Sequence, residues 1–391
     1  EMTSSLVGSE MCIRDREYDC STLACKKHID LALKSAREGI TLIQNENNVL
    51  PLDLKKNRKI LVLGKLANME NIGDHGSSEV HPPYIVTPLE GIIREAQETE
   101  VIYYEGQDHD RAKELAREAD AVIFVVGYNY NDEGEYCAED DLDQYLQGVG
   151  GDREVSLDLH KEEIDLINTV GSVNPNSVAV LMGGNMIMME SWKKSVSAVM
   201  MAFYPGMEGG TAIAEIIFGK INPSGKLPYV VPVKESDLPQ VNWRTSEQHY
   251  DYYHGYAKLE KEGIEPSIPY GFGLSYTTFQ FSNASFYVKD GIVSAECDVR
   301  NTGDRDGTEV VQMYAGFKHS SVDRPVKVLR GFKRVDLKAG ESKRVEINCP
   351  AEELKWFNPD TNQFELEHMK YEVYIGSSSS DRDLIEGVVE L

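Results

Sequence analysis

The sequence predicts an α/β fold: a mostly parallel-sheet α/β sandwich, followed by a second, all-β sandwich. In the first part of the chain, short apolar runs alternate with segments of helical periodicity, as in a parallel sheet that helices cover on both faces. From residue 280 onward, helical signals are few, and short β-rich runs alternate with turn sequences. The 391 residues are enough for two or three packed cores.

The chain begins with a stretch that we expect to lie outside the fold. Residues 1–16 have neither the charged-then-apolar order of a signal peptide nor a helical or strand period, and we interpret them as a cloning or sequence-assembly scar. Residues 17–58 are expected to form a helix and a turn, because apolar residues from Ile29 to Ile43 recur at broadly the spacing of an amphipathic helix. The helical pattern is followed by an Asn-rich stretch at residues 45–52, where the turn is expected.

Residues 59–279 are predicted to form the α/β unit. Its strands are expected at residues 60–64, 101–104, 121–126, 177–182 and 198–203, and its helices at 109–119, 161–170 and 210–218. A dinucleotide-binding fold is the rival, since Gly64 and Gly127 lie at the ends of strands. We reject it because residues 73–78 lack the third glycine of the nucleotide-binding motif and are followed by two prolines rather than a helix.

Residues 280–391 are predicted to form the β-sandwich. Its β-rich runs include residues 293–299, 309–314 and 343–347, and turn sequences lie at 301–307, 338–341 and 358–361. Short strands separated by such turns are typical of a sandwich of two antiparallel sheets. The role expected for this unit is structural.

The composition limits the kinds of partner that the chain can have. A net charge of −25 and a pI near 4.8 disfavour nucleic acid and anionic membranes, because both are polyanions. No apolar stretch approaches the length that spans a bilayer. Six scattered cysteines form no zinc-binding pattern, so we expect free thiols, which favour a reducing, cytoplasmic compartment. The sequence supports no phosphate loop, metal cluster or Ser/His/Asp triad, and we predict no cofactor and no metal.

Five motifs occur in one order along the α/β unit. They are the acidic loop at 127–136, Gly-Gly-Asp-Arg at 150–153, Tyr-Pro-Gly-Met-Glu-Gly-Gly at 204–210, Asn-Pro-Ser-Gly-Lys-Leu-Pro at 222–228, and an aromatic, glycine-containing stretch at 269–279. Together they resemble the carboxyl-terminal half of family 3 glycoside hydrolases, the β-glucosidase family. Residues 299–312 and 329–334 resemble the fibronectin-III-like (immunoglobulin-like) domain of the same family, and residues 26–52 resemble its linker helix.

The resemblance implies hydrolysis of terminal β-linked sugars with retention, which needs two carboxyl groups about 5 to 5.5 Å apart. In the family, the nucleophilic Asp lies on an amino-terminal (β/α)8 barrel, in a Ser-Asp-Trp setting, and the acid/base Glu lies on the α/β sandwich. Ser-Asp occurs here only at 236–237 and 380–381, in polar loops. We therefore expect the barrel and its nucleophile to be missing from this chain, and the chain alone to be inactive.

The resemblance also implies the partners. The substrate is expected to be a β-glucoside or an oligosaccharide, with a β-xyloside as the alternative, and the barrel is a partner in cis or in trans. Self-association of the chain as a homo-oligomer is a further expectation, because the face that would contact the barrel is predicted to be exposed and partly apolar around Tyr84, Tyr128 and Tyr136. A different class of function is a non-catalytic carbohydrate-binding or accessory module that has no barrel.

Glu133 is the candidate acid/base. It lies six residues after Gly127, on the loop that follows the third predicted strand, where the resemblance places this role. Neighbouring carboxylates are expected to help keep an acid protonated near neutrality. Glu135 is the second candidate. The alternative interpretation is a solvated acidic loop without a catalytic role.

The loop after the first predicted strand supplies the candidate sugar-binding residues. Asp74, His75 and Ser77 are expected to hydrogen-bond sugar hydroxyls, and Tyr84 is expected to stack on a sugar ring, although a structural turn accounts equally well for each of them. The Asp152–Arg153 pair is expected to be a structural ion pair.

Overall fold

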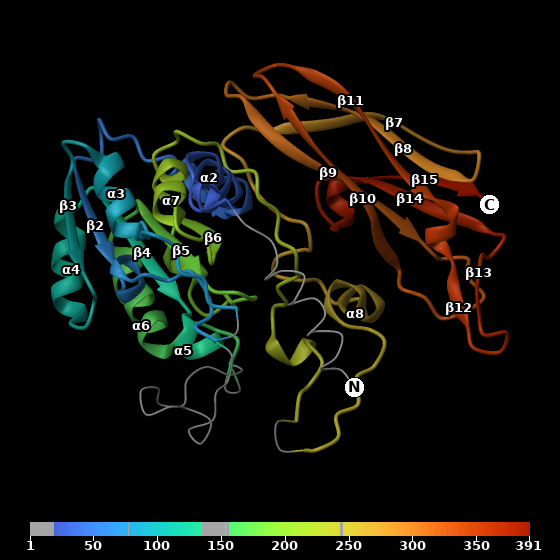
Figure 1. Cartoon of the computed structure of the whole chain (residues 1–391), viewed down its shortest axis with the longest axis horizontal. Helices are drawn as coiled ribbons and strands as arrows, with labels where there is room; N and C mark the ends of the chain where they lie inside the picture. Colours follow the sequence, from blue (N-terminus) through green and yellow to red (C-terminus); the bar gives the residue numbers. More distant parts are fainter. Residues whose placement is uncertain (1–18, 77, 135–152, 154–155, 243–244) are drawn as a thin grey trace.

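The structure, a computed structural model, describes residues 19–76, 78–134, 153, 156–242 and 245–391. It contains two units in the predicted order, an α/β unit with a six-stranded sheet and a β-sandwich (Figure 1). The predicted fold class is therefore confirmed. Within these described ranges, no helix is both long and apolar enough to cross a membrane.

The five predicted strands of the first sheet are present, each within one residue of its expected ends. They are β2 (Lys59–Leu63), β3 (Glu100–Tyr104), β4 (Ala121–Gly127), β5 (Ser177–Met182) and β6 (Ala198–Phe203). Neighbouring strands of this set run parallel, in the sheet order β1-β6-β5-β4-β2-β3. Every residue of β4 and β5 is buried, which explains why these strands are continuous apolar runs rather than alternating ones.

The sixth strand, β1 (Thr41–Asn45), corrects the sequence analysis. Helix α2 (Lys26–Gly39) ends at Gly39, whereas the apolar spacing predicted a helix that continues through Ile43. Residues 41–45 instead pair antiparallel with β6, where Thr41 faces Met201. In this strand Leu42 is fully buried, so burial against the sheet outweighs the helical spacing of the segment.

Helices cover both faces of the sheet. On one face lie α2, α3 (Pro88–Ala96) and α7 (Gly209–Ile217), and on the other lie α4 (His109–Glu118) and α6 (Lys161–Val170). A capping box between Thr87 and Glu90 fixes the start of α3. Helices α3 and α7 approach so closely that a Cβ added at Gly91 would overlap the backbone carbonyl of Gly210.

The second unit is a sandwich of two antiparallel sheets. One sheet has the order β10-β9-β14-β15 and the other the order β11-β8-β7. Its strands are β7 (Phe279–Lys289), β8 (Ile292–Asn301), β9 (Gly307–Gly316), β10 (Lys327–Leu337), β11 (Ser342–Pro350), β14 (Lys370–Gly376) and β15 (Leu384–Glu390), with a hairpin of β12 (Trp356–Asn358) and β13 (Gln363–Glu365). Cys297 and Cys349 are free, buried thiols in its core.

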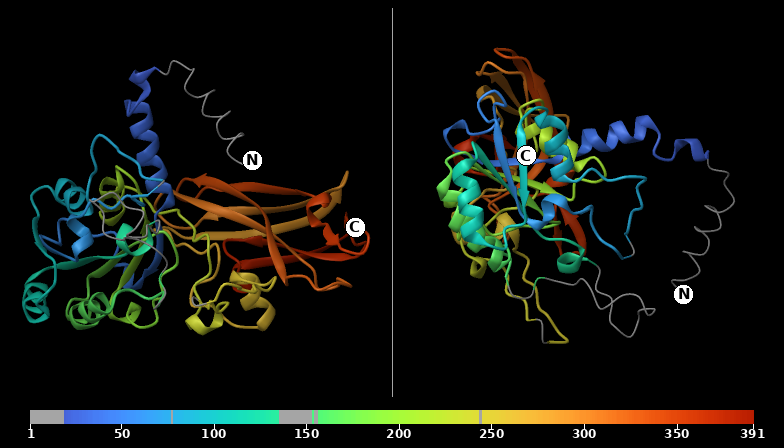
Figure 2. Two further views of the ribbon diagram at one scale, coloured as in Figure 1. Left: turned by 60° about the horizontal axis from the view of Figure 1, so that its bottom comes forward. Right: turned by 90° about the vertical axis from the view of Figure 1, so that its left-hand side faces the viewer.

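Shorter helices complete the described elements. They are α5 (Tyr130–Glu133), α8 (Gly255–Glu262) and the 3₁₀ turns η1 (Cys20–Thr22), η2 (Glu46–Asn48), η3 (Lys65–Asn68), η5 (Gly171–Val173), η6 (Lys193–Ser195), η7 (Glu235–Asp237), η8 (Ala351–Leu354) and η9 (Asp381–Asp383). Helix α8 lies beside the junction of the two units (Figure 2). It reaches the sandwich through Glu260, whose carboxylate lies 2.8 Å from the Lys327 ammonium.

Polar side chains connect the two units directly. The Lys226 ammonium lies 2.7 Å from a Glu309 carboxylate oxygen, and both side chains are nearly buried, with 12% and 8% of their surface exposed. The side-chain amide of Gln312 donates to the carbonyl oxygens of Gly271 and Ser377. Because these polar contacts are shielded from water, they are stronger than exposed ones. They hold the sandwich in a defined position against the α/β unit.

Candidate functional site

The candidate site lies where β4, β5 and β6 end. Because these strands are parallel neighbours in the sheet, the loops after them meet at one edge, which is where open α/β sheets bind ligands. The loop after β4 forms the single-turn helix α5, which starts with a capping box between Asn129 and Asp132. Glu133 is the last residue of this turn.

Glu133 is held by groups from three different segments. Its Oε2 accepts hydrogen bonds from the Gly184 N–H at 2.6 Å and the Tyr204 hydroxyl at 2.8 Å. Its Oε1 lies 3.2 Å from Nε of Arg153. The Glu133 side chain is only 12% exposed, so the interpretation of a solvated acidic face does not describe this residue.

Two glycines in the loop after β5 lie beside Glu133. Gly183 has a φ of +153°, which side-chain-bearing residues rarely adopt. At Gly184, an added Cβ would lie 3.1 Å from the Tyr204 ring and 3.5 Å from Glu133 Oε2. The sequence analysis did not include these residues in the site, although two glycines directly after a buried strand were the available signal.

Arg153 supplies the charge at the site. Its guanidinium lies 4.3 Å from the centre of the Tyr128 ring, and its Nη2 donates to the Met186 carbonyl at 2.8 Å. Arg153 forms an ion pair with Glu133, while the predicted pair with Asp152 stays a prediction, since Asp152 lies outside the described residues. Among the described residues, a cation therefore lies in direct contact with the Glu133 carboxylate. Burial and the nearby carboxylate raise the pKa of Tyr204, so its hydroxyl keeps the proton that it donates to Glu133.

A second cluster adjoins this loop at the start of α6. His160 Nε2 lies 3.0 Å from Asp132 Oδ1, and this carboxylate raises the pKa of His160. Burial acts to raise the pKa of Asp132, but hydrogen bonds from His160 and from the Asn129 N–H keep it below its ordinary value. Glu163 accepts a hydrogen bond from the Gly127 N–H at 3.1 Å, and burial raises the pKa of Glu163 to about 7. The loop is therefore tied to the start of α6 by ionisable groups whose pKa values are shifted from their ordinary values.

The predicted sugar-binding residues fall into two places. Asp74 lies beside the Glu133 loop, since its Oδ1 would be 3.1 Å from a Cβ added at Gly134, and its Oδ2 accepts a hydrogen bond from Ser78. His75 stacks on Tyr130 of α5 with ring centres 3.6 Å apart. Asp74 and His75 thus lie beside α5 and the residue after it, whereas Ser77 and Glu135 lie outside the described residues.

The aromatic residues that were expected on an exposed face differ in how much of their surface is exposed. Tyr84 is 42% exposed, and its hydroxyl donates to Glu208 at 2.6 Å, next to the start of α7. Tyr128 is only 3% exposed, so the expectation of an exposed ring is wrong there. Its hydroxyl donates to the Asp158 carbonyl and its ring packs against Arg153 and His160, which accounts for the burial. Tyr136 lies outside the described residues.

Most of the chain matches two family models. Residues 40–276 match the glycosyl hydrolase family 3 C-terminal domain, and residues 309–379 match a fibronectin type III-like domain. A β-glucosidase of Bacteroides ovatus is 31% identical over 94% of this chain and 52% of its own length. A β-xylosidase of Formosa agariphila is 32% identical over 92% of this chain and 49% of its own length.

Solved structures give the same result. A β-D-glucoside glucohydrolase of Trichoderma reesei superposes with a TM-score of 0.85 at 25% identity, over 94% of this chain and 56% of that one. A β-glucosidase of Bifidobacterium adolescentis superposes with a TM-score of 0.82 at 29% identity, over 98% of this chain and 55% of that one. The chain thus spans about half the length of the relatives that it matches. From these matches and from the fold, the chain belongs to glycoside hydrolase family 3, within its C-terminal α/β domain and fibronectin type III-like domain.

Proposed function

We propose that the chain supplies the acid/base half of a retaining β-glucosidase, with Glu133 as the proton donor and acceptor. The observation that carries the proposal is the position of Glu133, a nearly buried carboxylate at the edge of the sheet where the loops after β4, β5 and β6 meet. A rigidly held carboxyl group at such an edge suits proton transfer to a departing sugar oxygen.

The hydrogen bonds assign different tasks to the two carboxyl oxygens. Gly184 and Tyr204 both donate to Oε2, which fixes the orientation of the group. Among the described residues, Oε1 contacts Arg153, and the geometry of this contact does not amount to a hydrogen bond. Oε1 is thus the oxygen with capacity left to exchange a proton with substrate. The nucleophilic carboxylate would come from a barrel in cis or in trans.

β-Glucosides are the substrate class that we propose, and β-xylosides are the alternative. The relatives include a β-glucosidase, from Bacteroides ovatus, and a β-xylosidase, from Formosa agariphila. The competing function is a non-catalytic carbohydrate-binding module, in which the ion pair of Glu133 with Arg153 is purely structural.

The 391-residue chain alone should not hydrolyse an aryl β-glucoside. In the family, the nucleophilic carboxylate lies on the barrel, and without that group no glycosyl-enzyme is expected to form. The measurement is release of nitrophenol by purified chain. Turnover above the uncatalysed rate that persists in Glu133→Gln would contradict the proposal.

The acid/base role is tested in a chimera that joins the preceding half of the Bacteroides ovatus relative to this chain. Protonation of the leaving oxygen matters most for a poor leaving group, so Glu133→Gln should lower cellobiose cleavage by about 10²- to 10⁴-fold. Formation of the glycosyl-enzyme from a nitrophenyl glucoside should change far less. Azide needs no general base, and should restore turnover of that substrate as a β-glucosyl azide.

Glu162→Gln is the matched control, because Glu162 is an exposed glutamate on α6 near the same loop. It should leave both substrates unaffected. If Glu135→Gln shows the leaving-group dependence and azide rescue instead, the role belongs to Glu135. If neither variant shows them although the parent chimera is active, the acid/base proposal for this loop fails.

A further inference from the structure

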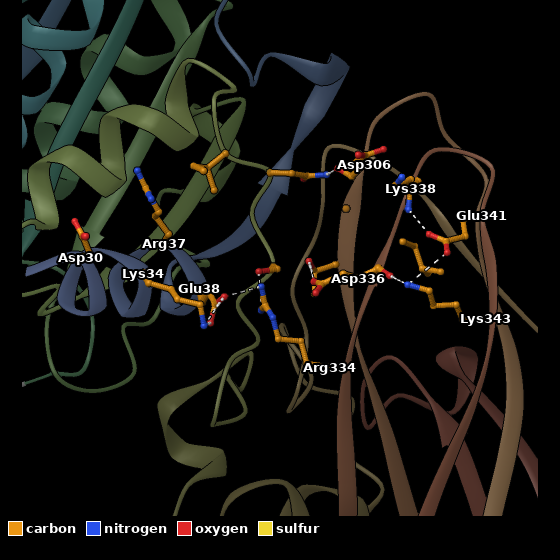
Figure 3. A pocket seen from close by; sticks show the side chains of 16 residues that line it. Asp30, Lys34, Arg37, Glu38, Asp306, Arg334, Asp336, Lys338, Glu341 and Lys343 are labelled. Carbon is orange, nitrogen blue, oxygen red and sulfur yellow. Dashed lines mark hydrogen bonds and ion pairs between the residues drawn. The ribbon is translucent and has the colours of Figure 1, made fainter. Parts of the chain in front are cut away.

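The cleft between α2 and the sandwich is charged, but its charges are largely paired with one another. It has a volume of about 770 Å³ and is lined by acidic and basic side chains (Figure 3). Glu38 lies 3.2 Å from Arg334, and Glu341 lies 3.4 Å from Lys343. A ligand there would have to displace existing ion pairs, so this cleft offers little to bind.

A carboxyl group in a different setting lies next to the loop that carries Glu133. Glu163, in the first turn of α6, is so deeply placed that burial raises its pKa to about 7. Its Oε1 accepts the hydrogen bond from the Gly127 N–H at 3.1 Å, whereas its Oε2 is buried without a hydrogen-bond partner among the described residues. Because burying a carboxyl group costs free energy, packing alone does not explain a glutamate at this position.

The Gly127 N–H is a group that the sheet leaves without a strand partner. The next residue, Tyr128, donates its N–H to the Met182 carbonyl of β5 at 2.9 Å. On the other side of β4, the pairing with β2 ends at Phe124. Since successive N–H groups along a strand point in opposite directions, the Gly127 N–H faces the side on which β2 no longer pairs. Glu163 supplies the acceptor there.

A second contact holds the same loop from the start of α6. His160 directly precedes this helix, and its Nε2 lies 3.0 Å from Asp132 Oδ1. The other oxygen of Asp132 accepts a hydrogen bond from the Asn129 N–H at 3.0 Å. Asp132 directly precedes Glu133 in the single turn α5. The start of α6 thus contacts the loop twice, before α5 through Glu163 and within α5 through His160.

Helix α6 is a firm support for these contacts, because Leu166, Ile167 and Val170 are buried in the core of the α/β unit. The turn α5, by contrast, has four residues, from Tyr130 to Glu133. A helix of one turn is not stable by itself, so the position of its last side chain depends on anchors outside the turn.

We propose that Glu163 is a positioning residue, which fixes the end of β4 through the Gly127 N–H and so holds the loop that carries Glu133 at the edge of the sheet. It acts through the backbone and does not touch the substrate. The consequence for catalysis rests on the proposed function, but the anchoring of the loop does not depend on proton transfer by Glu133.

Hydrogen exchange of the 391-residue chain, followed by mass spectrometry at pH 7, tests the anchor. Glu163→Met keeps the length of the side chain but has no oxygen that can accept from Gly127, so the amides of residues 127–134 should exchange about tenfold faster. The amides of residues 166–170, within α6, should keep their rates. Glu163→Asp, whose shorter side chain withdraws the carboxyl group, should have the same effect and provides a second variant.

Two further variants are the controls for this experiment. Glu163→Gln retains an acceptor oxygen at the same distance along the side chain and should restore the slow exchange of the parent chain. Glu162→Met changes an exposed glutamate in the same turn of α6 and should exchange as the parent chain does.

The kinetic test uses the chimera with the preceding half of the Bacteroides ovatus relative. Glu163→Met should lower kcat for cellobiose by about tenfold and change KM by less than about twofold, because a misplaced proton donor affects mainly the departure of a poor leaving group. Formation of the glycosyl-enzyme from a nitrophenyl glucoside should change little. In a chimera that already carries Glu133→Gln, the same substitution should have no further effect on cellobiose.

The outcomes separate this proposal from the proposed function. Faster exchange confined to the loop in Glu163→Met and Glu163→Asp, and restored in Glu163→Gln, supports the anchor. Unchanged exchange in both variants overturns it, as does equal acceleration by Glu163→Gln. An equal loss on both substrates that persists in the Glu133→Gln background indicates a general structural role and also overturns it. If Glu133→Gln keeps the parent activity on cellobiose, the acid/base role fails, while the exchange experiment still decides the anchor.

Discussion

At the scale of single residues, the position of the Glu133 carboxylate is fixed by the groups that contact its two oxygens. Two neutral donors fix Oε2, and a guanidinium that is itself nearly buried faces Oε1. A buried charge pair is costly to break on one side only, because the remaining charge has neither water nor a partner. A change that removes the charge of Glu133 is therefore expected to leave the nearly buried Arg153 guanidinium uncompensated.

Replacing Arg153 by methionine should lower the free energy of unfolding by about 3 kcal/mol or more, since it leaves the Glu133 carboxylate buried and unpaired. Urea unfolding measures the change. The double variant Arg153→Met with Glu133→Gln should recover part of the loss, because no uncompensated charge remains. If the single variant loses less than about 0.5 kcal/mol, the pair behaves as a solvated surface contact.

Glu163 should make stability depend on pH. Its pKa is raised from an ordinary value of 4.5 to about 7 in the folded state, mainly by burial. The folded state then binds more protons than the unfolded state between these values, so stability is full below about pH 4.5 and is lost as the pH rises through about 7. The raised pKa of His160 acts in the same direction.

Glu163→Gln isolates this contribution. The variant and the parent chain should unfold alike at pH 4.5, and the variant should be more stable at pH 8 by on the order of 2 kcal/mol. Thermal unfolding across this range measures the difference. Glu162→Gln, on the same helical turn but exposed, should show no such divergence, and a parallel pH profile for Glu163→Gln would rule out a buried carboxyl group.

Only part of the site could be predicted from single residues. The position of Glu133 follows from its place after a buried strand, because strand ends locate loops. Its pairing with Arg153 does not follow, since a separation of twenty residues along the chain gives no measure of the distance between two side chains. The burial of Tyr128 could not be predicted either. A tyrosine in a polar loop looks the same in the sequence whether its ring faces water or packs against an arginine.

At the scale of elements, burial determined whether a segment formed a strand or a helix where the sequence pattern was ambiguous. The strands β4 and β5 were predictable because continuous apolar runs of six or seven residues favour a strand buried on both faces. The end of α2 could not be predicted. The helix ends at Gly39, whereas the helical spacing of apolar residues continues through Ile40, Leu42 and Ile43. The partner that makes residues 41–45 a strand is β6, far along the chain.

The contact between α3 and α7 gives an element-scale prediction. Gly91→Ala places a Cβ against the Gly210 carbonyl, and should destabilise the α/β unit by about 1 to 3 kcal/mol because the two helix backbones must separate. Gly39→Ala is the control, since nothing lies within 4 Å of its Cβ and alanine favours helices. It should be neutral or stabilising by up to about 1 kcal/mol. Equal thermal shifts for both variants would contradict the close approach.

At the scale of the whole molecule, the two units share a buried ion pair. Lys226 and Glu309 contact each other across the junction, with little access to water. The sequence placed each residue in its unit but gave no sign that they meet, because the contact depends on how the units pack. The predicted boundary near residue 279 stays a prediction, although β7 begins at Phe279.

Glu309→Gln should uncouple the units. It leaves the Lys226 charge buried without its carboxylate, at a cost of about 3 to 5 kcal/mol. In differential scanning calorimetry, a single transition of the parent chain should separate into two. Glu386→Gln removes a pair with Lys318 whose side chains are about half exposed, and should change little. A variant Glu309→Gln that unfolds as the parent does would show that other contacts alone join the units.

The edge strand β1 has a consequence for how the α/β unit folds during synthesis. Thr41 leaves the ribosome well before Met201, its partner in β6, so β1 has no strand to pair with until most of the α/β unit has been made. Contacts so distant along the chain form slowly. Leu42, which is fully buried at the end, remains exposed in the meantime. An outer strand that docks late is also the one most easily taken from a neighbouring copy, and we expect crowded refolding to yield dimers that exchange α2 and β1.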